Sequence, residues 1–596
     1  MNAYAGRTVR VDLSRGRITK ETIDLRLAKA FVGGRGLGTK ILYDEINPKV
    51  DPLASANKLI FAAGPLTGTS APSGCRWMAI TKGALTGAVA SSNAGGDFGP
   101  ELKYAGYDMI IVEGVAKHPT MLVIDDDSVE LCSAQKLWGE NVHATEDLLH
   151  EQLGGNFKCA SIGPAGERLV RFASIMNDKN RAAGRSGVGA VMGSKKLKAI
   201  AVRGSGGVTV ADPKRFRAVC LDALGKLQAG TVGLSRYGTA SLVNVINARG
   251  VLPTRNFQSG QFEGAETISG EAIAERILIR NRACFGCPIA CGRVTAVKNG
   301  KYAGSGEGPE YESIWALGAD VGIDDLAAAT KANYICNELG MDPITAGATV
   351  ACAMELYEKG AITEKQAGCK LSFGNADALV DLMTKIGYRR GFGNVLAEGA
   401  ARVARKFGKP ELFMGVKKQE FPAYDARGAV GMGLQYATSN RGACHVRGYM
   451  VARELLDGEQ KMNPFTTRGK AAATIAVQDL TAALDSSGIC LFTTFAIGAP
   501  ELLAMLTAAT GFDYDLDEML RAGERIWNLE RLFNQRAGLS RKDDTLPKRL
   551  LAEPMPAGPA KGKTVPLGKM LPEYYRLRGW DAEGRPTRTK LASLGL

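Results

Sequence analysis

The chain has 596 residues, of which 45% are hydrophobic and 23% charged, so it is long enough for several folded domains and too apolar for a disordered protein. Its net charge is +14, but the Lys and Arg residues are dispersed, which favours an anionic cofactor or an acidic protein partner over nucleic acid. No apolar run reaches the roughly 18 residues that cross a membrane, and the N-terminus lacks the apolar core of a signal peptide. We therefore expect a cytoplasmic protein with no membrane span, whose cysteines stay reduced.

Strand-like alternation dominates the first third of the chain. Residues 7–22 predict a hairpin, and further strands are expected at 58–63, 76–81, 109–113, 121–125 and 197–202. The run Gly204–Gly207 marks a domain boundary. No internal repeat is visible in the sequence.

Glycine-rich loops connect these strands. Gly33–Gly38 has the spacing G-x-G-x-G without a surrounding βαβ unit, and Gly189–Lys195 is one residue short of a P-loop, so both are weak nucleotide signals. The loops Gly74–Arg76, Ser91–Gly96 and Arg181–Gly189 combine small residues with polar or cationic ones. Glycine lets backbone N–H groups approach a ligand and Arg contacts phosphate, so these loops predict either a site for a bulky phosphorylated cofactor or simply tight turns.

Helical spacing of apolar residues follows the Gly204–Gly207 boundary. Helices are expected at 325–339, 344–359, 471–484, 501–510 and 517–535, with a weaker boundary at 407–412 and an irregular segment at 554–563. The predicted fold class is α+β. It comprises a β-rich domain at 1–207 and two mostly helical domains at 208–412 and 413–596.

Cys284, Cys287 and Cys291 lie within eight residues and form the strongest local motif. Three thiolates this close can hold a soft metal centre, and Cys490 is the candidate for a fourth ligand. Four Cys ligands suit a [4Fe–4S] cluster, and structural zinc or buried free thiols are the alternatives that the spacing leaves open.

Several motifs, in order along nearly the whole chain, resemble the tungsten-containing aldehyde:ferredoxin oxidoreductase family. They are Gly33–Gly38, Gly64–Gly68, Ala183–Ala199, Cys284–Cys291, Gly308–Glu312, Asp485–Cys490 and Tyr574–Trp580. The resemblance implies a domain of two related sheets that holds a tungsten–bis-molybdopterin (tungstopterin) cofactor, with two helical domains completing the site. It also implies a Mg²⁺ ion between the pterin phosphates and one [4Fe–4S] cluster held by Cys284, Cys287, Cys291 and Cys490.

The resemblance carries over position by position to further residues. Asn93 and Ala182 are expected to bind Mg²⁺ through their backbone carbonyls. Of two Asp-x-x-Gly-Leu-(Asp/Cys) pterin loops, the first has Asn337 in place of its leading Asp, and the second has Ile489 in place of Leu. The residues expected at the cofactor are Arg76, Asn93, Ala94, Gly95, Arg181, Ala182, Gly184, Arg185, Asn337, Met341, Asp342, Arg447, Asp485, Gly488, Ile489 and Cys490.

Aldehyde oxidation needs a base and a carbonyl-polarising group beside the metal centre. Glu312 is the candidate base, with Glu310 as its nearby rival. His445, one of four His residues in the chain, is the candidate hydrogen-bond donor to the aldehyde oxygen. Tyr311 is a third candidate, as a donor to a metal-bound oxygen.

The implied reaction converts an aldehyde to a carboxylic acid, or the reverse with a low-potential donor. Electrons pass through the cluster to a ferredoxin, or to a multi-cluster ferredoxin-like subunit with or without a flavin/NAD(H) subunit. The stretch Lys331–Tyr334 replaces the Glu-x-x-His motif of family members that bridge two subunits with a metal, so we expect an oligomer without that metal. The alternatives are the tungsten subunit of a benzoyl-CoA reductase and a non-catalytic iron–sulfur electron-transfer subunit.

Overall fold

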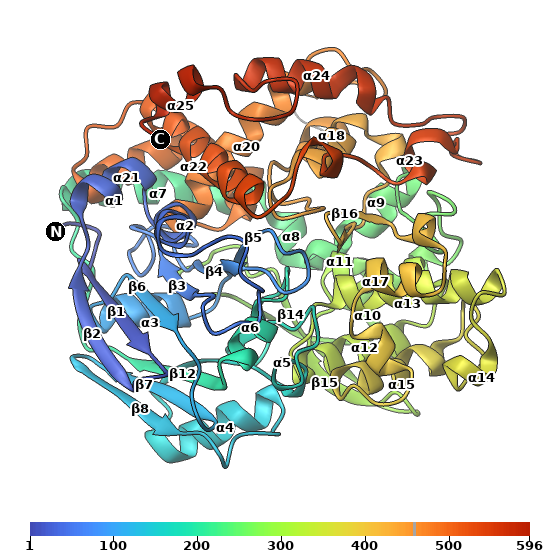
Figure 1. The fold of residues 1–596 in the computed structure, drawn as a ribbon, viewed down its shortest axis with the longest axis horizontal. Helices are drawn as coiled ribbons and strands as arrows, with labels where there is room; N and C mark the ends of the chain where they lie inside the picture. The colour runs from blue at the N-terminus through green and yellow to red at the C-terminus, as the bar shows by residue number, and fades with distance from the viewer. Residues whose placement is uncertain (457–460) are drawn as a thin grey trace.

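Two six-stranded sheets form the first part of the molecule, as seen in the computed structural model, which describes residues 1–456 and 461–596 (Figure 1). The first sheet has the order β2-β1-β6-β3-β4-β5 and the second the order β8-β7-β12-β9-β10-β11. Their strands are β1 (Arg7–Asp12), β2 (Arg17–Thr22), β3 (Leu59–Ala63), β4 (Trp77–Lys82), β5 (Val89–Ala94), β6 (Met109–Glu113), β7 (Thr120–Asp125), β8 (Ser128–Ser133), β9 (Lys158–Ser161), β10 (Ile175–Asn177), β11 (Arg181–Ala183) and β12 (Leu197–Arg203).

The two sheets repeat one topology. In each, a hairpin is joined to a parallel strand, and three further antiparallel pairings follow. Strands β1 to β6 therefore correspond in order to β7 to β12. The expectation of two related sheets is confirmed, whereas the expectation of no internal repeat is wrong, because strand order and direction are shared without a visible sequence match.

Alternation along the strands explains how the sheets pack. Leu59 and Phe61 of β3 share an apolar core with Leu122 of β7. The intervening Ile60 packs instead with Leu42 of α2 (Gly34–Glu45). Because successive strand residues point to opposite faces, each sheet packs on the other and is covered by helices outside.

Mostly helical segments follow the sheets and surround the rest of the molecule. Figure 1 shows most of the yellow-green and yellow helices at the right of the sheets, α7 at the left, and the red helices across the top. The helices that position the site are α7 (Pro213–Gly230), α8 (Val232–Tyr237), α11 (Tyr311–Ala316), α12 (Leu326–Leu339), α13 (Pro343–Glu358), α15 (Ala376–Gly387), α17 (Ala400–Lys406), α18 (Val430–Thr438), α20 (Lys470–Ser487), α21 (Ala499–Thr510), α22 (Leu516–Arg536) and α24 (Leu567–Arg578). The five helices predicted from spacing are confirmed as α12, α13, α20, α21 and α22. Two small sheets, β13–β15 (Leu278–Arg282, Gly292–Val297, Gly304–Glu307) and β16–β17 (Gly415–Val416, Gln419–Glu420), complete this part.

Helices α12 and α20 end in the same way against the two sheets. Each stops at a left-handed glycine, Gly340 (φ 71°) or Gly488 (φ 93°), a conformation that suits a residue without Cβ. The Arg76 N–H, just before β4, donates to the Gly488 carbonyl at 2.9 Å, and the Ser174 N–H, just before β10, donates to the Gly340 carbonyl at 2.9 Å. The repeat therefore places one helix end at the same point of each sheet.

None of the helices in the described residues is both long and apolar enough to span a membrane.

Candidate metal and cofactor centre

Two adjoining cavities lie where the sheets meet the helices. The first has a volume of about 300 Å³ and the second about 250 Å³. They share Arg76, Ala182, Glu312 and His445 in their walls. Residues from both six-stranded sheets and from the mostly helical part that follows them therefore line one continuous region. This region is large enough for an extended ligand.

The predicted cluster cysteines come together beside the first cavity. Cys284, Cys287 and Cys291 occupy the loop between β13 and β14, and Cys284 and Cys291 line that cavity. Ser73 links them to Cys490: its hydroxyl donates to Cys287 Sγ at 3.2 Å, and its carbonyl accepts from the Cys490 N–H at 3.2 Å. Ser73, Cys287 and Cys490, each about two hundred residues from the next in sequence, thus meet at one place in the folded chain.

Positive charge surrounds these thiols. The Arg76 guanidinium donates to Cys490 Sγ at 2.7 Å. A hydrogen bond from Cys75 holds the pKa of Cys284 well below its ordinary value, and Arg181 and Arg76 lower it further. Arg76 and Arg181 therefore favour the thiolate form of Cys284, which is the form that binds a metal.

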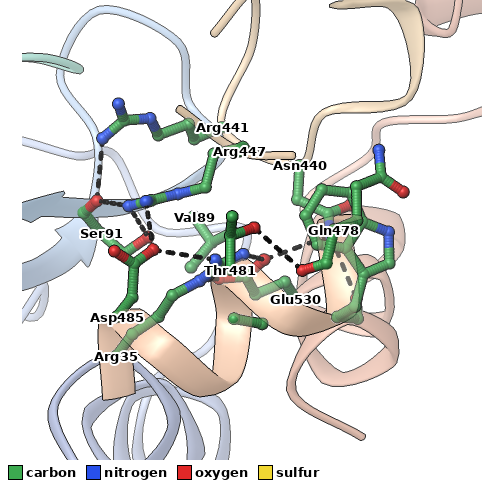
Figure 2. Close-up of polar contacts among 12 residues, drawn as sticks. Arg35, Val89, Ser91, Asn440, Arg441, Arg447, Gln478, Thr481, Asp485 and Glu530 are labelled. Atoms are coloured by element: carbon green, nitrogen blue, oxygen red, sulfur yellow. Dashed lines mark hydrogen bonds and ion pairs between the residues drawn. The ribbon is translucent and has the colours of Figure 1, made fainter. Parts of the chain in front are cut away.

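Asp485, which begins the second predicted pterin loop, is held by a buried polar network (Figure 2). Arg447 Nη1 lies 2.5 Å and Arg35 Nη1 3.2 Å from the same Asp485 Oδ2. Arg35 also forms two hydrogen bonds of 2.7 Å to the Glu530 carboxylate, and Arg447 donates to Ser91 Oγ of β5 at 3.0 Å. Helices α2, α20 and α22 are therefore tied to the first sheet at the point where Asp485 faces the second cavity.

Asp342, which ends the first predicted pterin loop, has an analogous support. Arg185 Nε donates to Asp342 Oδ2 at 3.1 Å, and the Thr345 hydroxyl donates to the same oxygen at 2.8 Å. Asn337, at the start of the loop, donates from Nδ2 to the Glu307 carbonyl at 3.1 Å and lines the first cavity. The two loops therefore lie at corresponding places in the two halves of the repeat.

The strand ends between these loops bring the predicted magnesium residues together. Asn93 lies near the end of β5 and Ala182 in β11, and these two edge strands contact each other. Asn93 Oδ1 accepts from Arg76 Nη1 at 3.1 Å, and Asn93 Nδ2 lies 3.4 Å from Asp485 Oδ1. A Cβ added to Gly95 would come within 2.9 Å of Cys284 Sγ, so glycine allows the close approach of this strand end to the cysteines.

Several residues of these cavity walls have a buried polar atom without a hydrogen-bond partner. These atoms are Arg76 Nε, Glu312 Oε1, His445 Nδ1 and Arg447 Nε. Such atoms are costly unless something satisfies them, so their concentration on these cavity walls fits a polar, anionic ligand. The arginines among these residues are suited to the phosphates of a cofactor.

Glu312 and His445 face each other across the cavity wall. Glu312 Oε1 lies 3.5 Å from His445 Nε2, and Glu312 Oε2 accepts from the Ala423 N–H at 2.9 Å. Burial raises the pKa of Glu312 to about 8. Burial, reinforced by nearby arginines, lowers the pKa of His445 well below its ordinary value. At neutral pH the pair is therefore a largely protonated carboxyl beside a neutral imidazole.

Aromatic rings complete the first cavity. Tyr311, Tyr424, Tyr449 and Phe492 line it. The Tyr311 hydroxyl already donates to the Ala423 carbonyl at 2.8 Å, so it is not free to donate to a metal-bound oxygen in this conformation. Glu310 accepts from the Thr239 hydroxyl at 2.5 Å and also lines the cavity, on the side of Cys291.

The remaining predicted residues fall around the same region. Met341 lines the first cavity, Gly184 lines the second, and Ala94 ends β5 next to Gly95, which lines the first. Gly488 and Ile489 connect α20 to Cys490, and the Gly488 carbonyl accepts from the Arg76 N–H. Sequence reasoning missed Cys75, Arg35, Arg441 and Glu530. The only available signal was that Cys75 and Arg35 stand inside glycine-rich motifs.

The chain matches two family models that together cover most of its length. Residues 8–204 match the model described as the N-terminal domain of aldehyde ferredoxin oxidoreductase, and residues 221–596 match the model of its domains 2 and 3. The chain is 54% identical to the tungsten-containing aldehyde ferredoxin oxidoreductase of Pyrococcus horikoshii, covering 100% of this chain and 99% of that protein. The corresponding Pyrococcus furiosus protein is 53% identical, with 99% and 98% covered.

A solved structure has the same fold at lower identity. It is the active site complex BamBC of benzoyl coenzyme A reductase bound to 1,5-dienoyl-CoA. The superposition has a TM-score of 0.86 at 26% identity and covers 100% of this chain and 97% of that one.

Proposed function

Because this chain belongs to the aldehyde ferredoxin oxidoreductase family, we propose that it oxidises aldehydes to carboxylic acids at a tungsten–bis-molybdopterin centre. The observation that carries the proposal is the buried Glu312–His445 pair in a cavity wall that also includes Arg76, which donates to Cys490. A base and a polarising group thus stand beside residues suited to a redox cofactor. The same centre runs in reverse if a low-potential donor supplies the electrons.

The cofactor residues have defined places in this proposal. Arg76, Arg181, Arg185 and Arg447 are cationic and line the cavities, so they would bind the phosphates and pterin edges. The carbonyls of Asn93 and Ala182 would bind Mg²⁺. When bound, the tungsten centre accepts two electrons from the aldehyde.

The chain's own residues then orient the substrate and move its protons. Neutral His445 presents a ring N–H to the aldehyde oxygen and stabilises negative charge there. Glu312 in its ionised form removes a proton from the attacking water, because its raised pKa makes it a stronger base than an ordinary carboxylate. The aromatic wall excludes bulk water from the cavity, which strengthens both interactions.

Cys284, Cys287, Cys291 and Cys490 would hold a [4Fe–4S] cluster, which would supply the electron path to a ferredoxin-type protein or subunit. Arg76 contacts both Cys490 and Asn93, so it joins the cluster side to the pterin side. The stretch Lys331–Tyr334 offers no ligands for a metal between subunits, and the Tyr334 hydroxyl lies 2.7 Å from Thr295 Oγ1 inside the protein.

Reduction of an aromatic thioester is the second candidate function, because a benzoyl-CoA reductase complex shares the fold at a TM-score of 0.86. Metal analysis of the purified chain, with benzaldehyde oxidation and benzoyl-CoA reduction assayed in parallel, separates the two functions. We expect tungsten, iron and aldehyde oxidation with a ferredoxin-type acceptor. Activity with benzoyl-CoA alone would reverse the assignment, and protein that retains iron but no tungsten would point to an electron-transfer subunit.

A further inference from the structure

One hydroxyl lies between two buried carboxyl groups behind the second cavity. Thr345 Oγ1 is 2.8 Å from Asp342 Oδ2 and 2.9 Å from Glu420 Oε2. None of the three side chains is appreciably exposed, with Asp342 at 1% and the other two at 0%. Glu420 has no part in the chemistry proposed above.

The hydrogen atoms at this contact can be counted. A Thr hydroxyl has one hydrogen, and ionised carboxylates have none, so Thr345 cannot donate to both groups at once. Both contacts are satisfied only if one carboxyl carries a proton. Asp342 already accepts from Arg185 Nε and from the Ile344 N–H, which favour its ionised form. Glu420 therefore holds the proton and donates to Thr345, which donates to Asp342.

The surroundings of Glu420 agree with this count. Burial raises the pKa of Glu420 to about 7, against smaller opposing effects of Arg185 and Thr345. Its other oxygen, Oε1, accepts from the Ala400 N–H at 2.9 Å. The charged and titratable groups that interact with it are Arg185, Arg402 from α17 and Cys352 from α13.

The two ends of this chain of hydrogen bonds lie at different cavities. Asp342 lines the second cavity together with Glu312 and His445. At the other end, Glu420 accepts from the first residue of α17, and Arg402 of that helix lines a separate surface pocket of about 250 Å³. The remaining walls of that pocket include Arg389, Glu398 and Lys406.

We propose that Asp342, Thr345 and Glu420 form a proton relay that leads from the cofactor cavity toward the surface pocket at α17. This inference rests on the proposed function, in which aldehyde plus water gives acid, two electrons and two protons. The electrons leave on the side of Cys284. The relay gives the protons a separate exit.

The relay moves one proton without leaving a charge behind. Asp342 takes a proton from the cavity and passes a proton to Thr345 Oγ. Thr345 in turn gives its original hydrogen to Glu420, which has just released its own proton to a water molecule from the pocket at α17, the acceptor that this step requires. One proton enters and one leaves, no bond to carbon changes, and no oxidant is needed. Thr345 and Glu420 are positioning and transfer residues, because neither touches the reacting atoms.

Substitutions at Thr345 test the relay in the holoenzyme. Thr345→Val removes the hydroxyl at nearly constant volume, and we expect kcat to fall about tenfold with KM unchanged, since proton transfer and not binding is affected. The solvent deuterium isotope effect on kcat should increase. Thr345→Ser keeps a hydroxyl and should restore both values. Thr349→Val is the matched control, because Thr349 is fully buried on the same helix and its hydroxyl has no partner.

Infrared spectroscopy tests the proton on Glu420 without relying on activity. Glu420→Gln keeps a donor toward Thr345 but cannot titrate, and the difference spectrum from the wild type should show loss of a protonated-carboxyl band at neutral pH. Asp320→Asn is a control: burial raises the pKa of Asp320 to about 8, so its band should disappear without a change in kcat.

Two results would overturn the relay. One is a Glu420→Gln spectrum with no lost protonated-carboxyl band. The other is turnover by Thr345→Val and Glu420→Gln within about twofold of the wild type with an unchanged isotope effect. The infrared result can be obtained on cofactor-free protein. A chain without tungsten or aldehyde oxidation would therefore refute the proposed function and still report on Glu420.

Discussion

Burial sets the chemistry of individual residues in this protein. Glu312 would be fully ionised at neutral pH on the surface, but here its pKa is about 8, and the imidazole of His445 stays neutral because burial and three arginines disfavour its charge. A carboxyl group whose pKa lies near the working pH can both accept and return a proton. Sequence motifs could not predict the pKa shifts of Glu312 and His445, because the shifts depend on which residues bury the two side chains in the folded chain.

Glu312→Gln tests the assignment of the base. We expect kcat/KM for an aldehyde to fall by about 100-fold or more, which is the usual contribution of a general base. The amide still accepts from the Ala423 N–H, so the fold and the tungsten content should be kept. Wild-type activity should rise as pH increases through about 8, because the ionised fraction of Glu312 grows above its pKa, and the variant should lose this limb. A pH profile that is the same in both proteins would exclude Glu312 as the base.

Cysteine substitutions separate ligands from neighbours. Cys490→Ser should lower the iron content per chain and change the electron paramagnetic resonance spectrum of the reduced cluster. Cys75→Ser is the matched control: Cys75 is buried next to Cys284 but outside the proposed ligand set, so iron content should stay as in the wild type. Equal iron loss in both variants would mean that the assignment of the fourth ligand is wrong.

At the level of elements, the sequence predicted several strands and five helices, and it missed other elements of both kinds, including the 18-residue helix α7. The hairpin alternates in part, strands β3, β4, β6 and β12 are short and almost wholly buried runs, and α20 and α22 have clear helical spacing. Strands β10 and β11 have three residues each, too few for any period to show. Strand β5 is built of small, mostly buried residues, so it lacks alternation.

The supporting residues of the site were unpredictable for a related reason. Arg35 and Glu530 are 495 positions apart, and no local sequence pattern near either residue predicts that they form a pair. The cysteines were found because three of them are local. Cys490 was the candidate for the fourth ligand, and the family resemblance assigned it to the cluster.

The buried Arg35–Glu530 pair should position Asp485 and hence the cofactor. In Glu530→Gln, Arg35 loses its charged partner, and breaking a buried ion pair in this way typically costs about 3–5 kcal/mol. We expect tungsten per chain to fall while iron per chain is retained, because the network contacts the Asp485 loop and not Cys284.

Glu355→Gln is the matched control for this network. Glu355 forms a buried two-point pair with Arg549, with contacts of 2.6 and 2.9 Å, far from Asp485 in sequence and outside both cavity walls. It should lower stability to a similar extent without changing the tungsten content. Loss of tungsten in both variants would show a general effect of destabilisation.

On the scale of the whole molecule, the repeat of the two sheets predicts that cofactor binding stabilises the loop at the end of each sheet to a similar extent. Arg76 and Ser174 hold the two helix ends in the same way, and the loops at 337–342 and 485–490 face adjoining cavities. Hydrogen–deuterium exchange of cofactor-free and loaded protein should show that loading protects both loops and the ends of β5 and β11. Protection of one half alone would mean that the site holds a single pterin.

Strands β1–β6 and β7–β12 follow one another along the chain and form sheets with the same strand order. Tandem duplication of a coding segment produces this kind of arrangement. After such an event each copy can mutate alone. The loop against the first sheet now ends in Cys490, whereas its counterpart against the second sheet ends in Asp342. The two halves of the repeat therefore present different side chains at corresponding places, a thiol beside Arg76 in one and a carboxyl beside Arg185 in the other.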